Sequence, residues 1–350
     1  MKKSGFRYIV ILVTLIISVS GFYFSQKKTP VQKKVAVSST EQITQYLKEK
    51  DFNGVALVVK DKKIQLSAGF GYADYQQKIK NTAETSFPIA SIQKTITGSL
   101  IAEAVAEGKI SYDQPIVDFY PELANSSQIT IRQLLNQTSG IQMEETDPGE
   151  FLETQDSQLN YVLSELTVAD QIDFEYTNAN YSLLAGILSQ VYQLDYAELF
   201  SEKISTPLQL DHTYFSQDLS ADTSYAKGYP SEASLKNSEV AEESLPDAAN
   251  LFSSLLGAGN LLMSAENLWQ VESTFPNSSE LQSLLVSDSN YAGGYWLDNQ
   301  QLIGLGSIGA YASVLLMDQN RDSGVILLCN QANQNNLGEI ANKLWTISQE

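Results

Sequence analysis

The sequence predicts a mixed α/β protein of the α+β type, in which both ends of the chain complete a central antiparallel sheet beside a mostly helical subdomain. Strand-like segments occur early, at 54–71, and late, at 291–330, and mainly helical patterns lie between them. With 350 residues and 43% hydrophobic content, the chain is long enough to bury a substantial core. We therefore expect the early and late strands to share one sheet.

The first element along the chain is an apolar segment, residues 8–24, which carries no charged side chain. Residues 1–7 contain three basic residues, so the segment is just long enough for one tilted membrane span behind a basic cytoplasmic tail. A cleaved secretory signal is the alternative, because Ser18-Val-Ser20 places small residues near a cleavage point.

Residues 25–40 are rich in Lys, Ser and Val and contain no acidic residue, which is typical of an extended tether. We expect residues 41–350 to form an extracytoplasmic domain that a single-pass segment holds at the cell membrane, or that is secreted if the segment is cleaved. All charged residues before Val35 are basic, so this domain alone is more acidic than the chain's net charge of −19. An acidic surface repels nucleic acid and would attract cationic substrates, although the alternative, a solvated acidic surface that aids solubility, explains the same charge.

The domain opens with a predicted β-hairpin, in which Asp61-Lys62 joins strand-like residues 54–60 and 63–71. Two acidic segments, 142–173 and 217–250, interrupt the helical middle. We expect them to be loops that flank a cleft, although plain surface insertions would look the same. Late in the chain, three strand-like segments and then a helical pattern follow, at 291–297, 302–316, 324–330 and 337–347.

The most informative local pattern places Ser91 three residues before Lys94 at the start of a helical apolar pattern that extends to Gly108. Ser91 is then in the first helical turn, and Lys94 lies one turn along the same face. In its neutral form the amine can take the Ser91 proton, which activates a serine nucleophile without histidine. A second copy, Ser224-x-x-Lys227, runs directly into Gly and Pro, so no helix presents it.

Cysteine and histidine usage excludes other chemistries. The one cysteine, Cys329, permits no internal disulfide, and it lies in a strand-like run where we expect it to be buried. The one histidine, His212, lies in an Asp-His-Thr turn and is expected to be structural. The usual ligands of a transition metal are therefore lacking, and we expect no metal and no cofactor.

The chain's only Tyr-x-Asn triplet is Tyr176-Thr-Asn178, just before a helical run. Together with Ser91-x-x-Lys94 it resembles the serine β-lactamase and penicillin-binding-protein superfamily, in the branch of class C β-lactamases, DD-carboxypeptidases and related esterases. The resemblance covers about residues 41 to 345 and implies a β-lactamase/transpeptidase-like fold. Three supporting segments follow the family's order: Gly69–Asp74, Ile129–Ile141 and Pro207–Phe215.

By this resemblance Ser91 is the nucleophile, Lys94 its general base and Tyr176 the proton relay to the leaving group. Asn178 would hold the acyl amide of the substrate, and the backbone N–H groups of Ser91 and Ser307 would form the oxyanion hole. A half-buried structural tyrosine is the alternative for Tyr176.

The third family motif is a Lys or His, one further residue and Gly. It falls at Gly304-Leu-Gly306, because the following Ser307-Ile-Gly-Ala-Tyr matches the continuation of that strand. Gly304 thus stands where the family has a cation. We expect Gly306 and Ser307 to line the substrate site and backbone donors to support acylation, while recognition of a substrate carboxylate is in doubt.

The resulting expectation is an extracytoplasmic serine hydrolase that works through an acyl-enzyme on D-alanyl groups of the cell envelope. DD-carboxypeptidase and D-alanyl esterase activity remain open, with a peptidoglycan peptide or a D-alanylated teichoic acid as the polymer. Gly304 and the acidic domain favour the ester, which offers an ammonium and no terminal carboxylate. β-Lactamase activity is a weaker expectation than these two activities, since rapid deacylation needs a well-tuned base. The alternative class is a catalytically silent binding or regulatory module on this fold.

Overall fold

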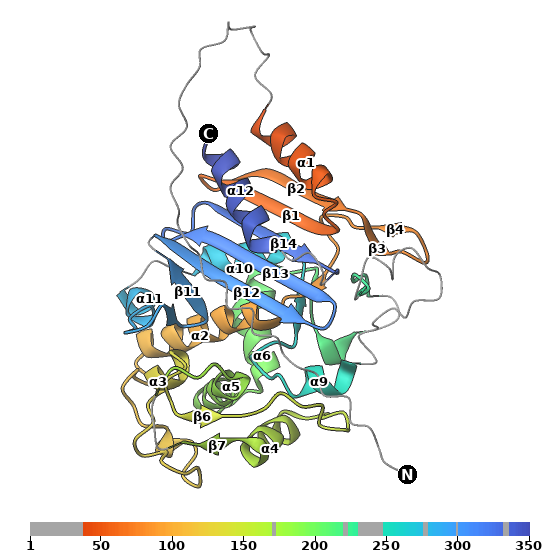
Figure 1. Ribbon diagram of the computed structural model, residues 1–350. Helices are drawn as coiled ribbons and strands as arrows, with labels where there is room; N and C mark the ends of the chain where they lie inside the picture. The colour runs from red at the N-terminus through yellow and green to blue at the C-terminus, as the bar shows by residue number, and fades with distance from the viewer. Residues whose placement is uncertain are drawn as a thin grey trace, which may run out of the picture.

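The structure, a computed structural model, describes residues 38–169, 173–219, 223–229, 248–275, 279–298, 300–331 and 336–350. Its centre is a seven-stranded antiparallel sheet with helices on both faces (Figure 1). In spatial order the strands are β10 (Tyr291–Ala292), β11 (Tyr295–Asp298), β12 (Gln301–Ile308), β13 (Tyr311–Asp318), β14 (Gly324–Cys329), β1 (Gly54–Lys60) and β2 (Lys63–Phe70).

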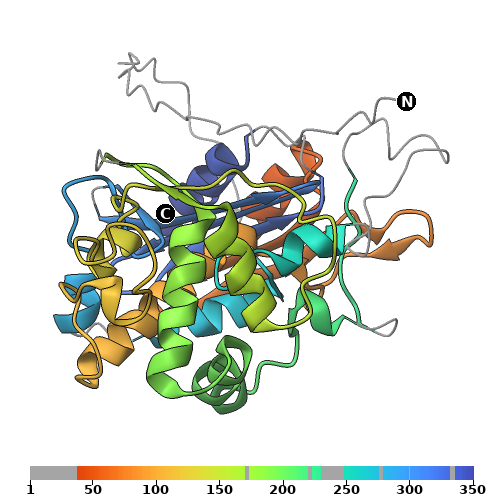
Figure 2. The same cartoon turned by 90° about the horizontal axis from the view of Figure 1, so that it is seen from below.

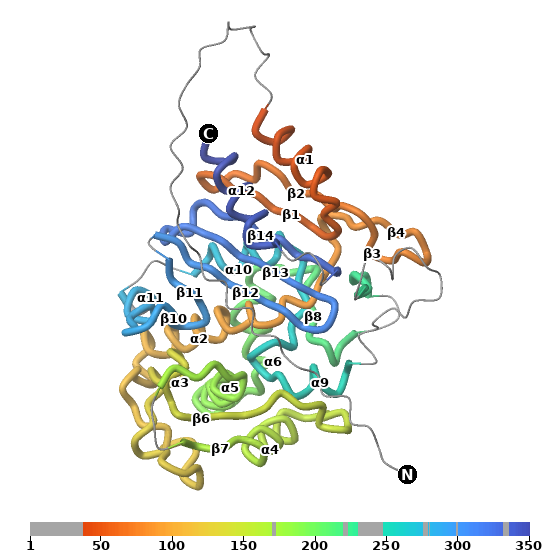
Figure 3. Tube along the Cα trace, viewed as in Figure 1, coloured from red at the N-terminus to blue at the C-terminus, as the bar shows by residue number. Residues whose placement is uncertain are grey.

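Both ends of the chain complete this sheet, as the sequence predicts. β1 pairs with β14 from Gly54 opposite Cys329 to Val59 opposite Gly324. β1 also forms the expected hairpin with β2, with an irregularity between Val58 and Val59. The tube in Figure 3 shows the early orange strands beside the late blue ones. This long-range pairing of β1 with β14 confirms the expectation that both ends of the chain complete one sheet.

The late part of the sheet has more strands than the sequence predicts. The expected strand 302–316 is the hairpin of β12 and β13, and the expected strand 291–297 is the hairpin of β10 and β11. Glycines with positive φ make these turns, with Gly309 at 53° and Gly293 at 57°. The prediction of three segments was wrong because apolar residues continue through both turns and hide them.

One face of the sheet is covered by the two terminal helices, α1 (Ser39–Glu49) and α12 (Leu337–Gln349), which lie side by side at the top of Figure 1. Their apolar faces and the outer faces of β1, β13 and β14 form a separate small core. The expected helix at 337–347 is confirmed. α1 begins inside the expected tether, because the Ser38 side chain caps the helix in a capping box with Glu41.

The other face carries α2 (Gln93–Ala106), α10 (Ala265–Thr274) and the helical subdomain, seen from below in Figure 2. α2 lies at the centre of the main core and is buried on nearly all sides. The other helical segments are α3 (Ile131–Leu135), α4 (Gln155–Glu165), α5 (Asn178–Tyr192), α6 (Tyr196–Phe200), α7 (Thr206–Leu208), α9 (Ala249–Ser253) and α11 (Ser279–Leu284).

The first acidic segment is only partly a loop. It contains α4 and the strand β7 (Thr167–Val168), which pairs with β6 (Ile141–Gln142). The Thr154 side chain caps α4, and Val162 is its buried apolar anchor. Most of the second acidic segment lies outside the described residues. The remaining short strands are β3 (Tyr72–Asp74), β4 (Ile79–Lys80), β5 (Phe87–Pro88), β8 (Thr213–Phe215) and β9 (Leu261–Met263).

The expected membrane segment, residues 8–24, also lies outside the described residues, as do residues 1–7 and most of the tether. Among the residues that the structure describes, no helix combines the length and apolar character needed to cross a membrane.

Candidate active site

Ser91 lies in a short 3₁₀ turn, Ala90–Ile92, between β5 and α2. The turn is strained, because Ala90 adopts a φ of 48°, a left-handed conformation that non-glycine residues rarely take. Ser91 itself stays partly exposed, whereas its neighbours Ala90 and Ile92 are buried. The expected helix is therefore present, and the serine stands just before it.

The turn that carries Ser91 is held by β12 and β13. Ser313 Oγ on β13 donates a hydrogen bond to Ile89 O at 2.9 Å. On β12, Gly306 lies so close that a Cβ there would meet Ile89 O at 2.3 Å and Ser313 Oγ at 2.2 Å. Ser307 follows on the same strand and is exposed. The structure thus brings Gly306 to the turn that carries Ser91 and places Ser307 next along that strand.

Lys94 is fully buried in the first turn of α2. Its Nζ lies 2.9 Å from Ser91 Oγ and donates to Ala258 O at 2.9 Å. A carbonyl oxygen can only accept, so one N–H of Lys94 is fixed there and the nitrogen is directed at Ser91. This distance lies within hydrogen-bond reach for proton transfer between the two groups.

Tyr176 reaches the same point from the segment before α5. The centroid of its ring lies 5.1 Å from Lys94 Nζ, and the Tyr181 ring lies 5.9 Å away. Tyr176 is half-buried, and its ring packs edge-on against Tyr291 at 5.7 Å. Asn178 is the first residue of α5, and its Oδ1 is buried without a hydrogen-bond partner. Ser91, Lys94 and Tyr176 therefore converge, with Asn178 two residues beyond Tyr176.

A polar network that sequence analysis assigned only to the fold holds the Tyr176–Asn178 segment. Gln137 Nε2 donates to Thr177 O at 3.1 Å, and Thr177 N donates back to Gln137 Oε1 at 3.2 Å. Asn180 Nδ2 also donates to Gln137 Oε1, and Ser139 Oγ donates to Asn180 Oδ1 at 2.7 Å. All four side chains are buried. The Ile129–Ile141 segment therefore positions the tyrosine.

A second buried network ties α2 to the sheet. Arg321 pairs with Glu272 at 3.2 Å, and both side chains are almost fully buried. Thr95, the neighbour of Lys94, donates to the other oxygen of Glu272, and the Tyr295 hydroxyl donates to Oε2 at 2.5 Å. Burial raises the pKa of the Tyr295 hydroxyl above its ordinary value, so it remains a donor at neutral pH.

Gly304 occupies the expected place on β12 beside the nucleophile turn. A Cβ at this position would lie 3.2 Å from Leu315 Cβ and 3.4 Å from Ile92 Cγ1. Gly304 is buried, so apolar neighbours stand where the family resemblance places a cation. The register inferred from the sequence is thus consistent with the structure.

Sequence analysis missed Glu145, which lies in the first acidic segment. Glu145, Asn178 and Ser182 line one small cavity. The residue as a whole is exposed, yet the protein around the carboxyl raises its pKa, and the nearby charge of Lys94 acts in the opposite direction. The one signal in the sequence for Glu145 is its position in the acidic segment 142–173, which was expected to flank a cleft.

Three other residues lie outside this constellation. His212 accepts hydrogen bonds from Ser86 and Ser264 through its backbone oxygen, in keeping with a structural role. Ser224 lies in a non-helical segment, so the second Ser-x-x-Lys pattern has no helix behind it. Cys329 is fully buried, which raises the pKa of its thiol to about 12.

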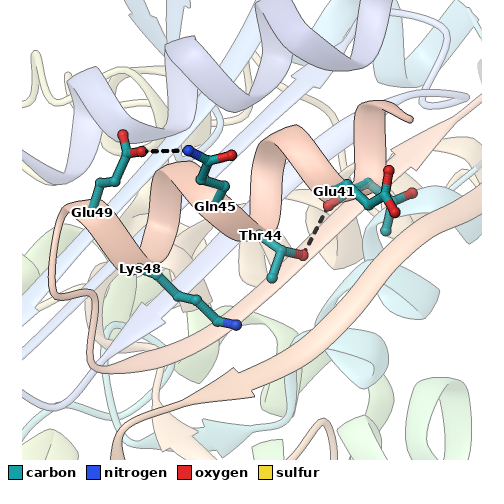
Figure 4. Close-up of a pocket in the computed structure, with 6 residues that line it drawn as sticks. Glu41, Thr44, Gln45, Lys48 and Glu49 are labelled. Atoms are coloured by element: carbon teal, nitrogen blue, oxygen red, sulfur yellow. Dashed lines mark hydrogen bonds between the residues drawn. The ribbon is translucent and has the colours of Figure 1, made fainter. Parts of the chain in front are cut away.

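A shallow hollow along α1 offers no comparable chemistry (Figure 4). Its side chains bond within the helix, with Gln45 Nε2 donating to Glu49 Oε1 at 2.8 Å and Thr44 Oγ1 donating to the backbone oxygen of Thr40 at 2.8 Å. α1 belongs to the core on the opposite face of the sheet from α2. Within the described ranges, no group of three or more His, Cys, Asp or Glu side chains is arranged to hold a metal.

Comparison with known proteins places these features in a family. A family model described as Beta-lactamase matches residues 40–348. The penicillin-binding protein PbpX of Bacillus subtilis (strain 168) is 27% identical over 339 residues, which cover 92% of this chain and 84% of PbpX. Protein flp of Staphylococcus aureus (strain MW2) is also 27% identical, over 78% of this chain, which spans only 58% of that protein.

Solved structures share the fold. FmtA from Staphylococcus aureus superimposes with a TM-score of 0.75 at 24% identity, covering 92% of each chain. The D-amino acid amidase from Ochrobactrum anthropi SV3, in complex with L-phenylalanine amide, gives a TM-score of 0.73 at 18% identity, covering 89% of this chain and 99% of the amidase. At these identities the structural likeness establishes the fold.

Proposed function

Since the chain belongs to the β-lactamase family of serine hydrolases, we propose that it acts through an acyl-enzyme on D-alanyl groups of the cell envelope. The single observation that carries this proposal is the distance of 2.9 Å between Lys94 Nζ and Ser91 Oγ. A base with this geometry is what a serine needs to become a nucleophile. The partner is a cell-envelope polymer, either a peptidoglycan peptide or a D-alanylated teichoic acid.

The reaction follows from the positions of three side chains. Neutral Lys94 takes the Ser91 hydroxyl proton while Oγ attacks the carbonyl carbon of the D-alanyl group. The resulting oxyanion is stabilised by the backbone N–H groups of Ser91 and Ser307. The ester C–O bond then breaks, and the leaving alcohol receives a proton through Tyr176. Water attacks the acyl-enzyme in the second step, which releases D-alanine and restores the Ser91 hydroxyl.

The D-alanyl ester is the preferred substrate type, because Gly304 provides no cation for a terminal carboxylate. The leaving group of a teichoic acid ester has no such carboxylate, so the lack of a cation at position 304 does not weaken the binding of this ester. A D-alanyl-D-alanine peptide and a penicillin both carry one. A structural neighbour named D-amino acid amidase, which has been solved in complex with D-phenylalanine, supports a D-configured acyl group in this fold.

We also propose that the domain works outside the cytoplasm, where these polymers lie. The uncharged segment at residues 8–24 would anchor it to the cell membrane, or direct its secretion if cleaved. The acidic domain favours a substrate with a free ammonium.

Active-site labelling tests the proposal. A fluorophosphonate, which reacts with activated serines, should label the wild type and Ser224→Ala and should not label Ser91→Ala. The same three proteins are then assayed for release of D-alanine from D-alanine methyl ester. Labelling that persists in Ser91→Ala would overturn the assignment of the nucleophile.

A second candidate is a catalytically silent binding module, which the absence of a cation at Gly304 favours. In that case the wild type would neither be labelled nor release D-alanine, although it would still bind the polymer. The two candidates therefore give opposite results in the same experiment.

A further inference from the structure

A small cavity opens beside Asn178, about 10 Å³ in volume. That is about the space one water-sized group occupies. Its walls come from the segment around Glu145, from the first turns of α5 and from the Ser254–Leu255 turn. The chain continues from that turn to Ala258, whose oxygen holds Lys94. Thr177 and Asn178 in its wall directly follow Tyr176, whose ring centroid lies 5.1 Å from Lys94 Nζ, so the cavity is lined by the segment that also carries Tyr176.

Two polar atoms in its walls have no partner. Asn178 Oδ1 and Ser182 Oγ are both buried and make no hydrogen bond within the described structure. Ser182 is fully buried, and its hydroxyl does not bond back to its own helix, which is the usual solution for such a serine. Buried polar groups are nearly always hydrogen-bonded, so two in one cavity indicate a missing partner.

The other polar side chains of the cavity are already engaged. Thr146 Oγ1 lies 3.0 Å from the Tyr161 hydroxyl, Thr177 Oγ1 accepts from Ala179 N at 3.3 Å, and Ser254 Oγ donates to Leu251 O at 2.8 Å. Asn178 Oδ1 can only accept a hydrogen bond and Ser182 Oγ can also accept one, so a ligand that donates hydrogen bonds would satisfy both atoms.

Charge gives the sign of that ligand. Glu145 lines the same cavity, and the protein around its carboxyl raises the pKa of that group. An ionised carboxylate can only accept hydrogen bonds and carries a negative charge, so it favours a positively charged donor. The Lys94 amine is already directed at Ser91 Oγ and Ala258 O. A positive charge brought by the substrate would complete the site.

We propose that this cavity is a subsite for the α-ammonium of the acyl group, with Asn178 Oδ1, Ser182 Oγ and the Glu145 carboxylate as its three acceptors. A primary ammonium has three N–H donors and is about the size of a water molecule, so it matches both the number of acceptors and the space. The inference rests on the proposed function and narrows it: the substrate is an ester of a free amino acid, and a group added to that nitrogen does not fit.

Three methyl esters test the subsite: D-alanine, N-acetyl-D-alanine and D-lactate. The D-lactate ester replaces the ammonium with a neutral hydroxyl of similar size, so it separates charge from bulk. For the wild type we expect kcat/KM for the D-alanine ester to exceed that for the D-lactate ester by roughly ten- to a hundredfold, as expected for a charge-assisted contact. The N-acetyl ester should be the poorest substrate.

Glu145→Gln should reduce the preference for D-alanine over D-lactate to within about threefold, mainly through KM for the D-alanine ester. The matched control is Glu144→Gln, an exposed neighbouring carboxylate outside the cavity, which should keep the wild-type preference. Fluorophosphonate labelling of both variants verifies that each protein is folded and that its Ser91 is reactive.

The outcomes separate the two proposals. Equal turnover of the D-alanine and D-lactate esters by the wild type, or an unchanged preference in Glu145→Gln, overturns the subsite and means that the cavity holds solvent only. A wild type that is labelled at Ser91 but hydrolyses none of the three esters overturns the proposed function instead.

Discussion

Gly306 and Ile89 approach so closely that only a hydrogen can stand between them. A Cβ at position 306 would lie 2.3 Å from the Ile89 carbonyl oxygen, which is backbone and cannot move aside cheaply. Ile89 starts the turn that carries Ser91, so the separation of β12 from the nucleophile depends on this contact.

Gly306→Ala should therefore push β12 away from the turn and lower both stability and labelling. We expect a loss of about 1–3 kcal/mol, typical of overpacking, and a slower fluorophosphonate reaction. Gly338→Ala is the matched control, since a Cβ there meets nothing within 4 Å on α12. That variant should keep or slightly raise the melting temperature. Equal melting temperatures and labelling rates for both variants would contradict the argument.

Lys94→Met removes the amine while filling the buried space with a chain of similar length. Loss of a positioned general base slows the reaction by about 10²- to 10⁴-fold, so the second-order rate of fluorophosphonate labelling should fall by that factor. Lys227→Met, in the pattern without a helix, should label at the wild-type rate. A Lys94→Met protein that reacts normally would show that another group activates Ser91.

Gly304→His should restore recognition of a substrate carboxylate. A hydrogen bond from the imidazolium to that carboxylate is worth about 1.5–3 kcal/mol, so acylation by a fluorescent penicillin should rise roughly ten- to a hundredfold. The new Cβ requires Leu315 and Ile92 to yield by a few tenths of an ångström, because it would lie 3.2 and 3.4 Å from them. Gly304→Ala carries this steric cost without the cation and is the reference. If both variants acylate at the same rate, position 304 does not serve carboxylate recognition.

Arg321→Met should strongly destabilise the fold, because it leaves the Glu272 carboxylate buried and unpaired. Breaking such a pair from one side costs about 3–5 kcal/mol, and urea unfolding would measure it. Lys62→Met is the control, since Lys62 pairs with Asp322 at 3.1 Å at the surface and should cost at most about 1 kcal/mol. Labelling should also slow in Arg321→Met, since Thr95 beside Lys94 depends on Glu272. A similar loss in both variants would contradict this reading.

The sequence predicted those parts of the site that depend on short separations or on a family motif. Ser91 and Lys94 lie on adjacent turns, so their contact follows from spacing alone. Tyr176 and Asn178 were found through the motif. Residues joined only by the fold were not found, such as Ala258, which holds Lys94 across 164 positions of the chain, and Glu272, which holds Thr95 across 177. Nothing local marks such contacts.

Fold prediction shows the same division. The hairpin of β1 and β2 and the helix α12 follow from local patterns. The pairing of the early and late strands into one sheet was predicted because strand-like segments lie at both ends of the chain. The turns at Gly293 and Gly309 were missed because apolar residues surround them, and α4 was missed because its segment is acidic and has few buried positions. Glu145 was missed because loops carry no periodicity.

The pairing of β1 with β14 also limits when the sheet can be completed during synthesis. β1 has its neighbour β14 only after residue 329 has been made, and a pairing between residues so distant in sequence forms slowly. The turn that carries Ser91 likewise packs against β12, residues 301–308, which is made much later in the chain. A chain still in synthesis therefore carries Ser91 before the strand that packs against its turn has been made.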